Sequence, residues 1–338
     1  MNPKAITTAM RDLCRIALKR EYIPALSCVR ITRQDGLATL QATDMERALT
    51  ITLTWPGADL DALYHAHTLL KMLRAGTTPD AALASLTTAC PVEDWPTPVI
   101  KLENPCTPIV LDPVPQFTRV AKAMSTEQTR YYLNGIYWHA HNGTLRAVTT
   151  DGNRMHLADS DTPAPDDMPG VILPRAAVDD LLAFKRGACL IEIGDLARFT
   201  WPGAVYVTKL VDGTFPDYQR VIPGADGQTT RMSRDALSAA IKTVSAIFSG
   251  RIGNVIMVSV ADGACTVTAK DLERGEMQAT LPASGALERV GFNPAYLLDM
   301  LASLTCDAVI YQADPRAPAR FEDASDPKFV GVIMPVVV

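Results

Sequence analysis

A short Asp-x-x-Arg element that occurs three times constrains the fold of this 338-residue chain more than any other feature. Each copy follows a stretch in which apolar and polar residues alternate, and the copies lie about a third of the chain apart. They are Asp44–Arg47, Asp151–Arg154 and Asp271–Arg274. Repetition at this spacing indicates one structural unit used three times. We therefore predict three domains in series, residues 1–103, 104–226 and 227–338.

Each repeat has the same order of predicted elements: helix, strands, helix, strands. The first helix of each repeat has a capping signal, which is Asn2 before Pro3, Asp112 before Pro113, and Ser233. After the first Asp-x-x-Arg element, apolar residues alternate with threonines from Leu49 to Trp55, as in a strand with one buried face. The second helices carry Leu69–Leu73, Leu181–Phe184 and Leu297–Leu301. This order predicts an α+β fold in which each domain has two helices against antiparallel sheet.

Composition excludes several classes of protein. The seven cysteines are scattered without a CxxC pair, and there is no nucleotide-binding loop or nucleophile motif. Two His-x-His pairs, His65/His67 and His139/His141, have no third ligand at a fixed spacing, so solvent-facing histidines are the favoured interpretation and no metal site is predicted. No apolar run approaches the ~20 residues of a membrane span. We expect a cytoplasmic protein without cofactor, catalytic residues or membrane contact.

The net charge of −5 argues against nucleic-acid binding by the chain as a whole, but some cations are grouped. Arg11, Arg15 and Lys19 would share one helix face at spacings of four residues. Further cations on the predicted opening helices are Arg119, Lys122 and Lys242. Such residues usually form a solvated face. Alternatively, they present charge to the phosphates of a polyanion, which would give binding without sequence preference.

Several segments resemble one known family, the beta subunit of bacterial DNA polymerase III, which is the DNA sliding clamp. The agreement is densest at Lys209–Val221 (KLVDGTFPDYQRV). The other matching segments are Thr129–Gly135, Thr149–Met155, Val171–Arg175, Gly291–Met300, Phe321–Ala324 and Met334-Pro335. They stand in family order over roughly residues 110–338, and the N-terminal third is similar more loosely.

The resemblance implies a processivity factor without enzymatic activity. Three clamp domains per protomer would assemble head-to-tail into a homodimeric six-domain ring around double-stranded DNA. A groove between the second and third domains would bind linear peptides of DNA polymerases and of the clamp loader. The groove residues that it implies are Leu133, Thr150, Gly152, Asn153, Arg154, Met155, Pro216, Arg220, Val221, Asn293, Tyr296, Val332, Ile333, Met334, Pro335 and Val336.

The resemblance also implies DNA contacts and a dimer contact. Arg20, Arg130, Tyr131 and Tyr132 would meet DNA from loops, and Ile247 and Phe248 would lie near the dimer interface. Two adjacent tyrosines on one strand would point in opposite directions, one into the core and one toward DNA. Without the resemblance, Met155, Val332 and Ile333 are better explained as core residues. Arg154 and Arg220 are explained equally well as members of ion pairs.

The chain departs from the family pattern in three places. Residues 74–89 cover only part of a hairpin that supplies one side of the dimer interface. The chain printed here ends in Pro335-Val-Val-Val338, without the basic penultimate residue common in the family. Arg316 and Pro318 replace smaller residues beside the groove. The alternative function is therefore an adaptor that keeps the peptide groove but does not encircle DNA.

Overall fold

The structure is a computed structural model that describes residues 2–19, 22–97, 102–225, 227–248 and 254–337. It divides into two compact units, which we treat separately. Unit 1 comprises Met1–Val114, Pro165–Pro169 and Ala176–Leu210. Unit 2 comprises Pro115–Ala164, Gly170–Arg175 and Val211–Val338. Each unit contains one antiparallel sheet, so the α+β class predicted from the sequence is confirmed.

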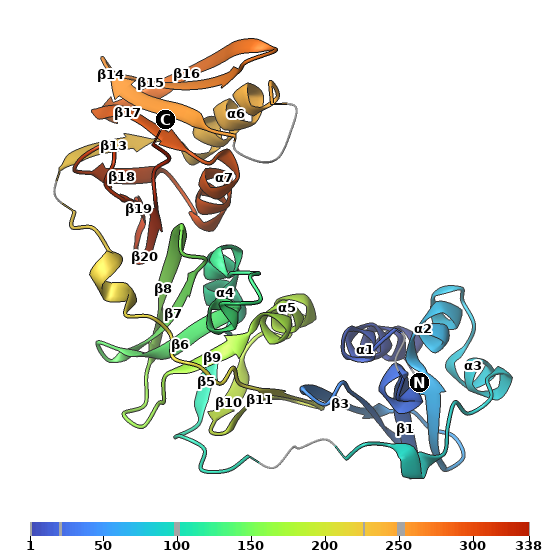
Figure 1. Cartoon of the computed structure of the whole chain (residues 1–338). Coiled ribbons are helices and arrows are strands. Elements are labelled where there is room, and N and C mark those ends of the chain that lie inside the picture. Colours follow the sequence, from blue (N-terminus) through green and yellow to red (C-terminus); the bar gives the residue numbers. More distant parts are fainter. Residues whose placement is uncertain (1, 20–21, 98–101, 226, 249–253, 338) are drawn as a thin grey trace. The chain divides into compact units, whose positions relative to one another are not determined.

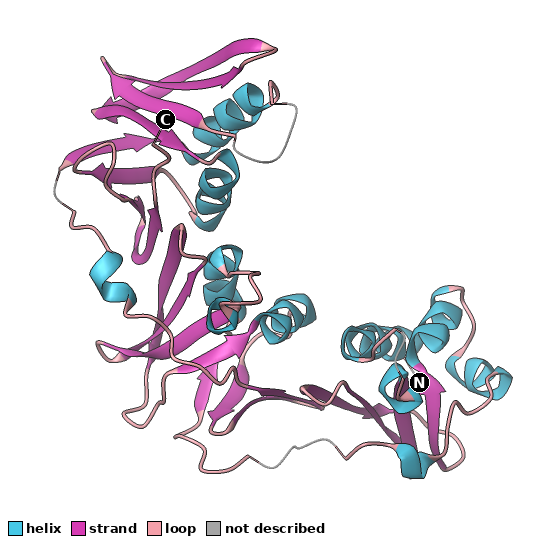
Figure 2. Ribbon diagram, in the orientation of Figure 1, coloured by secondary structure: helices cyan, strands magenta, loops and turns pink. Residues whose placement is uncertain are grey.

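The described residues form seven α-helices, shown in Figures 1 and 2. They are α1 (Pro3–Ile16), α2 (Ala66–Arg74), α3 (Pro79–Ser85), α4 (Val114–Val120), α5 (Arg175–Phe184), α6 (Arg234–Ser245) and α7 (Pro294–Ser303). Short 3-10 helices include Pro24–Ser27, Val92–Asp94, Ala121–Ala123, Tyr131–Leu133 and Tyr218–Val221.

Both sheets are built from antiparallel pairs. In unit 1 the strand order is β4 (Leu60–His65), β1 (Cys28–Gln34), β2 (Leu37–Thr43), β3 (Arg47–Thr54), β12 (Ala204–Lys209), β11 (Leu196–Trp201), β10 (Cys189–Ile193) and β5 (Ile109–Leu111). In unit 2 the order begins with β17 (Leu287–Phe292), β14 (Ile256–Ala261), β15 (Ala264–Asp271), β16 (Gly275–Gly285), β13 (Gln228–Met232) and β18 (Ala308–Gln312). It continues with β19 (Ala319–Asp323), β20 (Asp326–Ile333), β8 (Arg154–Pro163), β7 (Thr144–Thr150), β6 (Gly135–His141) and β9 (Val171–Pro174).

The Asp-x-x-Arg element forms the same turn in all three repeats. Oδ1 of Asp44 accepts hydrogen bonds from the backbone N–H of Glu46 at 3.0 Å and of Arg47 at 2.7 Å. The corresponding bonds join Asn153 and Arg154 to Asp151, and Glu273 and Arg274 to Asp271. A side chain that accepts from the backbone two and three residues ahead stabilises a tight turn. The element therefore closes the hairpins β2–β3, β7–β8 and β15–β16.

Strand pairing connects successive repeats. In unit 1, β3 pairs with β12, so a strand of the first predicted domain continues into strands of the second. In unit 2, β8 pairs with β20 and joins the second predicted domain to the third in the same way. The second repeat thus contributes strands to both sheets. The division into three domains stays a prediction.

The opening helix α1 begins as the sequence predicts but ends earlier. Oδ1 of Asn2 accepts from the N–H groups of Lys4 and Ala5 at 3.1 and 3.3 Å, which confirms the cap. Its apolar side, including Met10, is buried. The helix ends at Ile16 because Ala17 adopts an extended backbone. The prediction that Lys19 continues the face of Arg11 and Arg15 is therefore wrong.

The capping signals of the other two opening helices are also confirmed. Oδ1 of Asp112 accepts from the N–H of Val114 at 3.0 Å, and Oγ of Ser233 accepts from the N–H of Ala236 at 3.3 Å. The second of these helices is short: α4 ends at Val120 and continues as one 3-10 turn.

The other two repeats have strands after their second helix that the described part of the first repeat does not have. β10–β12 follow α5, and β18–β20 follow α7. Between α2 and β5, the described residues 75–97 and 102–108 contain α3 and a 3-10 turn but no strand. Asp80 of α3 accepts from the Arg33 guanidinium at 2.8 Å and from Nε1 of Trp55 at 3.1 Å, which holds α3 near β1 and β3. The partial hairpin expected in this region is not formed.

Candidate functional site

A cavity of about 260 Å³ lies entirely within unit 2. It is bounded by the β7–β8 turn, the 3-10 helix Tyr131–Leu133, the segment around Tyr218 and the end of β20. Its lining residues are Arg130, Tyr132, Leu133, Thr150, Gly152, Asn153, Arg154, Met155, Pro216, Asp217, Tyr218, Val221, Val332 and Met334.

The cavity brings together many of the residues that the sequence assigns to a peptide groove. Those that line it are Leu133, Thr150, Gly152, Asn153, Arg154, Met155, Pro216, Val221, Val332 and Met334. Those that do not are Arg220, Asn293, Tyr296, Ile333, Pro335 and Val336. The roles of both groups in binding stay predictions.

The floor of the cavity is part of an apolar core. Leu133, Met155 and Val332 are at most 5% exposed and belong to one cluster with Phe215 and Tyr218. Such a floor can accept aliphatic or aromatic anchor side chains, whose burial is favourable.

The segment between β12 and β13 forms one wall because its aromatic residues dock on β6. The ring of Phe215 stacks on Tyr137 with centroids 4.9 Å apart. The hydroxyl of Tyr218 lies 3.0 Å from Nε2 of His139. Burial lowers the pKa of His139, which favours the neutral ring at this contact. Asp217 and Tyr218 are lining residues that the sequence analysis missed, although they lie inside its densest segment of family resemblance.

Arg154 lines the cavity but its guanidinium is held by protein groups. Nε donates to Asp151 at 2.9 Å, Nη1 to Asp299 at 2.7 Å, and Nη2 to the carbonyl of Lys122 at 2.7 Å. The guanidinium carbon also lies 4.4 Å from the ring centroid of Tyr296. Every guanidinium nitrogen thus has a protein acceptor, which favours the ion-pair interpretation for this residue.

The predicted groove residues outside the lining have other contacts. The side chain of Asn293 caps α7, and Ile333 is fully buried. The side chain of Arg220 is 84% exposed beside Asp217. After β20, the backbone donates hydrogen bonds to the β7–β8 turn and to β17. The N–H of Met334 donates to the carbonyl of Asn153, and that of Val336 to the carbonyl of Gly291, each at 2.8 Å.

Arg119, which the sequence assigns to DNA, lies in an ion-pair cluster inside unit 2. It donates to Asp323 at 3.1 Å and to the carbonyl of Ser303 at 3.0 Å, and it also pairs with Asp326. Its guanidinium carbon lies 4.5 Å from the ring centroid of Phe329. Only 15% of the side chain is exposed. The assumption that Arg119 is on a solvated basic face is wrong, because the chain folds two carboxylates against it.

The other predicted DNA contacts on or next to the opening helices remain at the surface. Arg11, Arg15, Lys122 and Lys242 are all exposed. Three of them also pair with a carboxylate: Arg11 with Asp12 at 3.7 Å, Arg15 with Asp180 at 3.0 Å and Lys122 with Asp299 at 3.2 Å. Arg20 lies outside the described residues.

The two adjacent tyrosines form a 3-10 turn, so the expectation of a strand is wrong. Tyr131 is 54% exposed, and Tyr132 packs against the core cluster of the cavity. Arg130, on the same loop, pairs with Glu127 at 2.7 Å and donates to the carbonyl of Asp151. Arg130 and Tyr132 line the cavity, although the sequence analysis placed them only at DNA.

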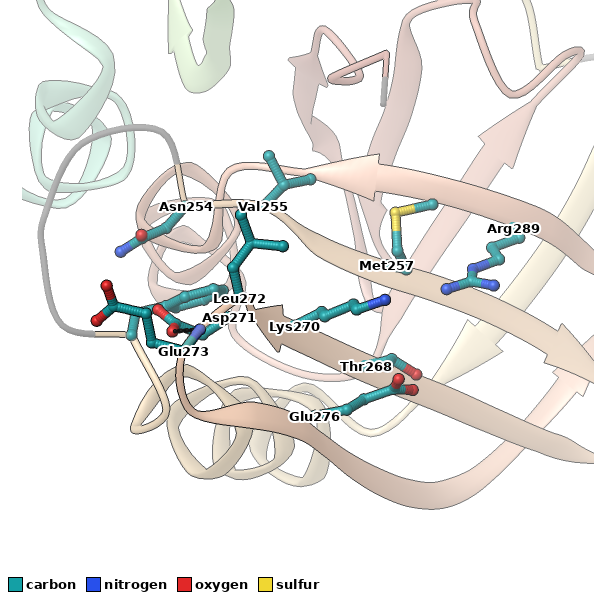
Figure 3. A pocket seen from close by; sticks show the side chains of 11 residues that line it. Asn254, Val255, Met257, Thr268, Lys270, Asp271, Leu272, Glu273, Glu276 and Arg289 are labelled. Carbon is teal, nitrogen blue, oxygen red and sulfur yellow. Dashed lines mark hydrogen bonds between the residues drawn. The ribbon is translucent and has the colours of Figure 1, made fainter.

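A second cavity, of about 910 Å³, lies at the β14–β17 end of unit 2 (Figure 3). Phe248, one of the two predicted dimer contacts, lines it, and the other, Ile247, is buried. Leu272, at the turn of the third Asp-x-x-Arg hairpin, is 97% exposed. The lining is Phe248, Asn254, Val255, Met257, Thr268, Lys270, Asp271, Leu272, Glu273, Glu276 and Arg289.

Within the described ranges, no group of three or more His, Cys, Asp or Glu side chains is arranged to hold a metal ion. Nor does any helix in those ranges have the length and apolar character needed to cross a membrane.

Comparison with known proteins finds one family. The family model for the central domain of the DNA polymerase III beta subunit matches residues 116–217 of this chain. The family model for the C-terminal domain of that subunit matches residues 219–337. The beta sliding clamp of Caulobacter vibrioides is 29% identical over 376 aligned positions, which include 99% of this chain and 98% of that protein. The beta sliding clamp of Vibrio cholerae is 34% identical over 221 positions, covering 63% of this chain and 60% of that protein.

Solved structures agree with these relatives. The structure of a sliding clamp (DNA polymerase III subunit beta) from Bartonella birtlesii, bound to griselimycin, has a TM-score of 0.88 at 29% identity. The superposed region includes 100% of this chain and 99% of the Bartonella chain. The beta sliding clamp of Caulobacter crescentus, with a polyethylene glycol bound at a beta-motif tethering region, also has a TM-score of 0.88, at 25% identity. The superposed region includes 100% of this chain and 98% of the Caulobacter chain.

Proposed function

The chain belongs to the DNA polymerase III beta subunit family, and we propose that it acts as a DNA sliding clamp subunit that binds linear peptide motifs of DNA polymerases and of the clamp loader. The observation that carries this proposal is the 260 Å³ cavity in unit 2. It combines an apolar floor at Leu133, Met155 and Val332 with polar groups at its rim, which is the usual form of a site for a short peptide with apolar anchors. The protein would do this work in the cytoplasm and without catalysis.

A direct titration tests the groove. A short labelled peptide with a glutamine and an aliphatic–aromatic pair should bind with a Kd in the micromolar range, about −8 kcal/mol. Each buried anchor contributes roughly 1.5–3 kcal/mol before the cost of ordering the peptide. Fluorescence anisotropy measures this affinity. The control peptide has alanines in place of the aliphatic–aromatic pair. Equal affinity for the two peptides would show that the apolar floor is not the binding site.

The DNA part of the proposal rests on exposed cations of the opening helices. Arg11 on α1 and Lys242 on α6 are exposed, and contacts of such residues to phosphates carry no sequence information. A ring that encircles duplex DNA needs only contacts of this kind. Binding to duplex DNA would then be indifferent to sequence and would weaken as salt is raised.

Ring closure requires a third joint, between the third repeat of one copy and the first repeat of another. The two junctions between successive repeats within the chain are built in the same way, from one strand pair and one ion pair. In unit 1, β3 pairs with β12 and Arg47 binds Asp180 of α5 at 2.6 Å. In unit 2, β8 pairs with β20 and Arg154 binds Asp299 of α7. The described residues of the first repeat in a second copy do not offer the same groups to the third hairpin.

Two features of the first repeat differ at this joint. Asp180 and Asp299 are each the sixth residue of their helix, and the sixth residue of α2 is Lys71. The same geometry would therefore place Arg274 opposite another cation. In addition, the described residues between α2 and β5 provide no strand to pair with β16. These observations favour the second candidate function, an adaptor that keeps the groove but does not encircle DNA.

Molecular mass separates the two candidates. If the protein closes a ring, light scattering should show the mass rising from 36.5 kDa toward twice that value with concentration. The Lys71→Asp variant, which would place a carboxylate opposite Arg274, should then lower the dissociation constant of the dimer by on the order of tenfold. Lys71→Ala is the matched control for loss of the cation alone. A constant monomer mass for all three proteins would reject the ring and leave the adaptor.

A further inference from the structure

We propose that Asp299 is a positioning residue of the peptide groove. It does not line the cavity, but it fixes the guanidinium of Arg154, which does. Asp299 would thus set the affinity for peptide without touching it. This inference rests on the proposed function of the cavity and adds a residue that acts on the same site from α7.

The carboxylate of Asp299 joins two cations from the second repeat. Its Oδ2 accepts from Nη1 of Arg154 at 2.7 Å, and its Oδ1 accepts from Nζ of Lys122 at 3.2 Å. The ring of Tyr296, one turn earlier on α7, lies under the Arg154 guanidinium. α7 therefore holds Arg154 by charge on one side and by an aromatic face on the other.

Arg154 has little freedom while these contacts are present. Its side chain is 10% exposed, whereas Asp299 is 33% exposed. If the carboxylate becomes neutral, Nη1 loses a charge-assisted hydrogen bond, and the guanidinium keeps only Asp151 as a charged partner. The freed end of the side chain lies beside the cavity, so it can enter the space that a peptide anchor would occupy.

Unit 1 contains the same arrangement without the cavity. Oδ2 of Asp180 accepts from Nη1 of Arg47 at 2.6 Å, and its Oδ1 accepts from Nε of Arg15 at 3.0 Å. Each carboxylate thus joins the arginine of an Asp-x-x-Arg turn to a cation near the end of an opening helix. None of the residues in the unit 1 cluster lines the 260 Å³ cavity. Asp180 is therefore a control for Asp299 that joins the same kinds of cation away from the groove, although it also accepts from the hydroxyl of Tyr206 at 3.1 Å.

The experiment compares Asp299→Asn with Asp180→Asn in the full chain. Two quantities are measured for each protein: the Kd for the labelled peptide by anisotropy, and the urea midpoint of unfolding. We expect Asp299→Asn to weaken peptide binding by about five- to tenfold. Asp180→Asn should leave the Kd within about twofold of the wild type. It should lower the urea midpoint at least as much as Asp299→Asn does, because Asp180 is almost fully buried.

The outcomes are distinct. If the wild type does not bind the peptide, the proposed function fails, and the positioning role fails with it. If the wild type binds and Asp299→Asn binds equally well, only the positioning role is overturned. Equal weakening by both variants would also overturn it, because the effect would then follow general stability and not the groove.

Discussion

Deletion of Met334 to Val338 is expected to weaken peptide binding by tenfold or more while the protein remains folded. Met334 lines the cavity, and its N–H holds this part of the chain to the carbonyl of Asn153. Met334 and Val337 are 45% and 70% exposed, so the deletion removes little core. Loss of one apolar wall should make the free energy of peptide binding less favourable by about 1.4 kcal/mol or more, which is at least a tenfold increase in Kd. Anisotropy with the labelled peptide measures it.

A shorter truncation provides the control for this prediction. Removing only Val337 and Val338 leaves Met334 and both backbone hydrogen bonds of the C-terminal segment in place, and it should not change the Kd. The urea midpoint of each truncated protein shows whether it is folded. If the five-residue deletion binds peptide as well as the intact chain, the groove is assigned to the wrong residues. If that deletion unfolds the protein, Met334 and its neighbours are needed for the core instead.

Replacement of Arg119 by alanine is expected to destabilise the protein by about 3–5 kcal/mol, because it leaves a buried carboxylate without its cation. The side chain of Asp323 is fully buried. Burial works to raise the pKa of Asp323, but hydrogen bonds from Cys306 and Thr305 hold it well below its usual range. The carboxylate therefore stays charged when Arg119 is removed. The cation–π contact with Phe329 is lost as well. Urea unfolding measures the change in free energy.

Lys122→Ala is the control for the Arg119 prediction. Lys122 is also a predicted DNA contact in the second repeat, but its side chain is 45% exposed, so its ion pair with Asp299 should contribute less than about 1 kcal/mol. Should Arg119→Ala unfold at the same urea concentration as the wild type and lose affinity for duplex DNA, Arg119 would be a DNA contact after all, and the cluster with Asp323 would not be structural.

Local features of the fold could be predicted from the sequence because their partners are close along the chain. The turn at Asp44 depends on backbone groups two and three residues away, and the cap at Asn2 has the same short range. Alternation in the strand after Asp44 was also readable, since side chains of a strand point to opposite faces in turn. These signals occur in each repeat and were sufficient for the α+β class.

The sites depended more on resemblance than on local pattern. The groove residues on the β7–β8 turn and in the segment after β12 were assigned because they match the family, and most of them line one cavity in unit 2. They are Thr150, Gly152, Asn153, Arg154, Met155, Pro216, Arg220 and Val221. Periodicity alone would have placed Met155 and Val332 in the core, and they do belong to a core cluster. A groove whose floor is also core has no separate signal in hydrophobic pattern.

Only the tertiary structure decided which cations are free and where the first helix ends. Arg15 and Asp180 are 165 residues apart, and Arg154 and Asp299 are 145 apart, so no spacing rule along the chain could pair them. The sequence determined the repeated hairpins and caps because short-range hydrogen bonds specify them. Folding decided the charge on each helix face, because a carboxylate distant in sequence neutralises a cation only after the sheets have brought the two together.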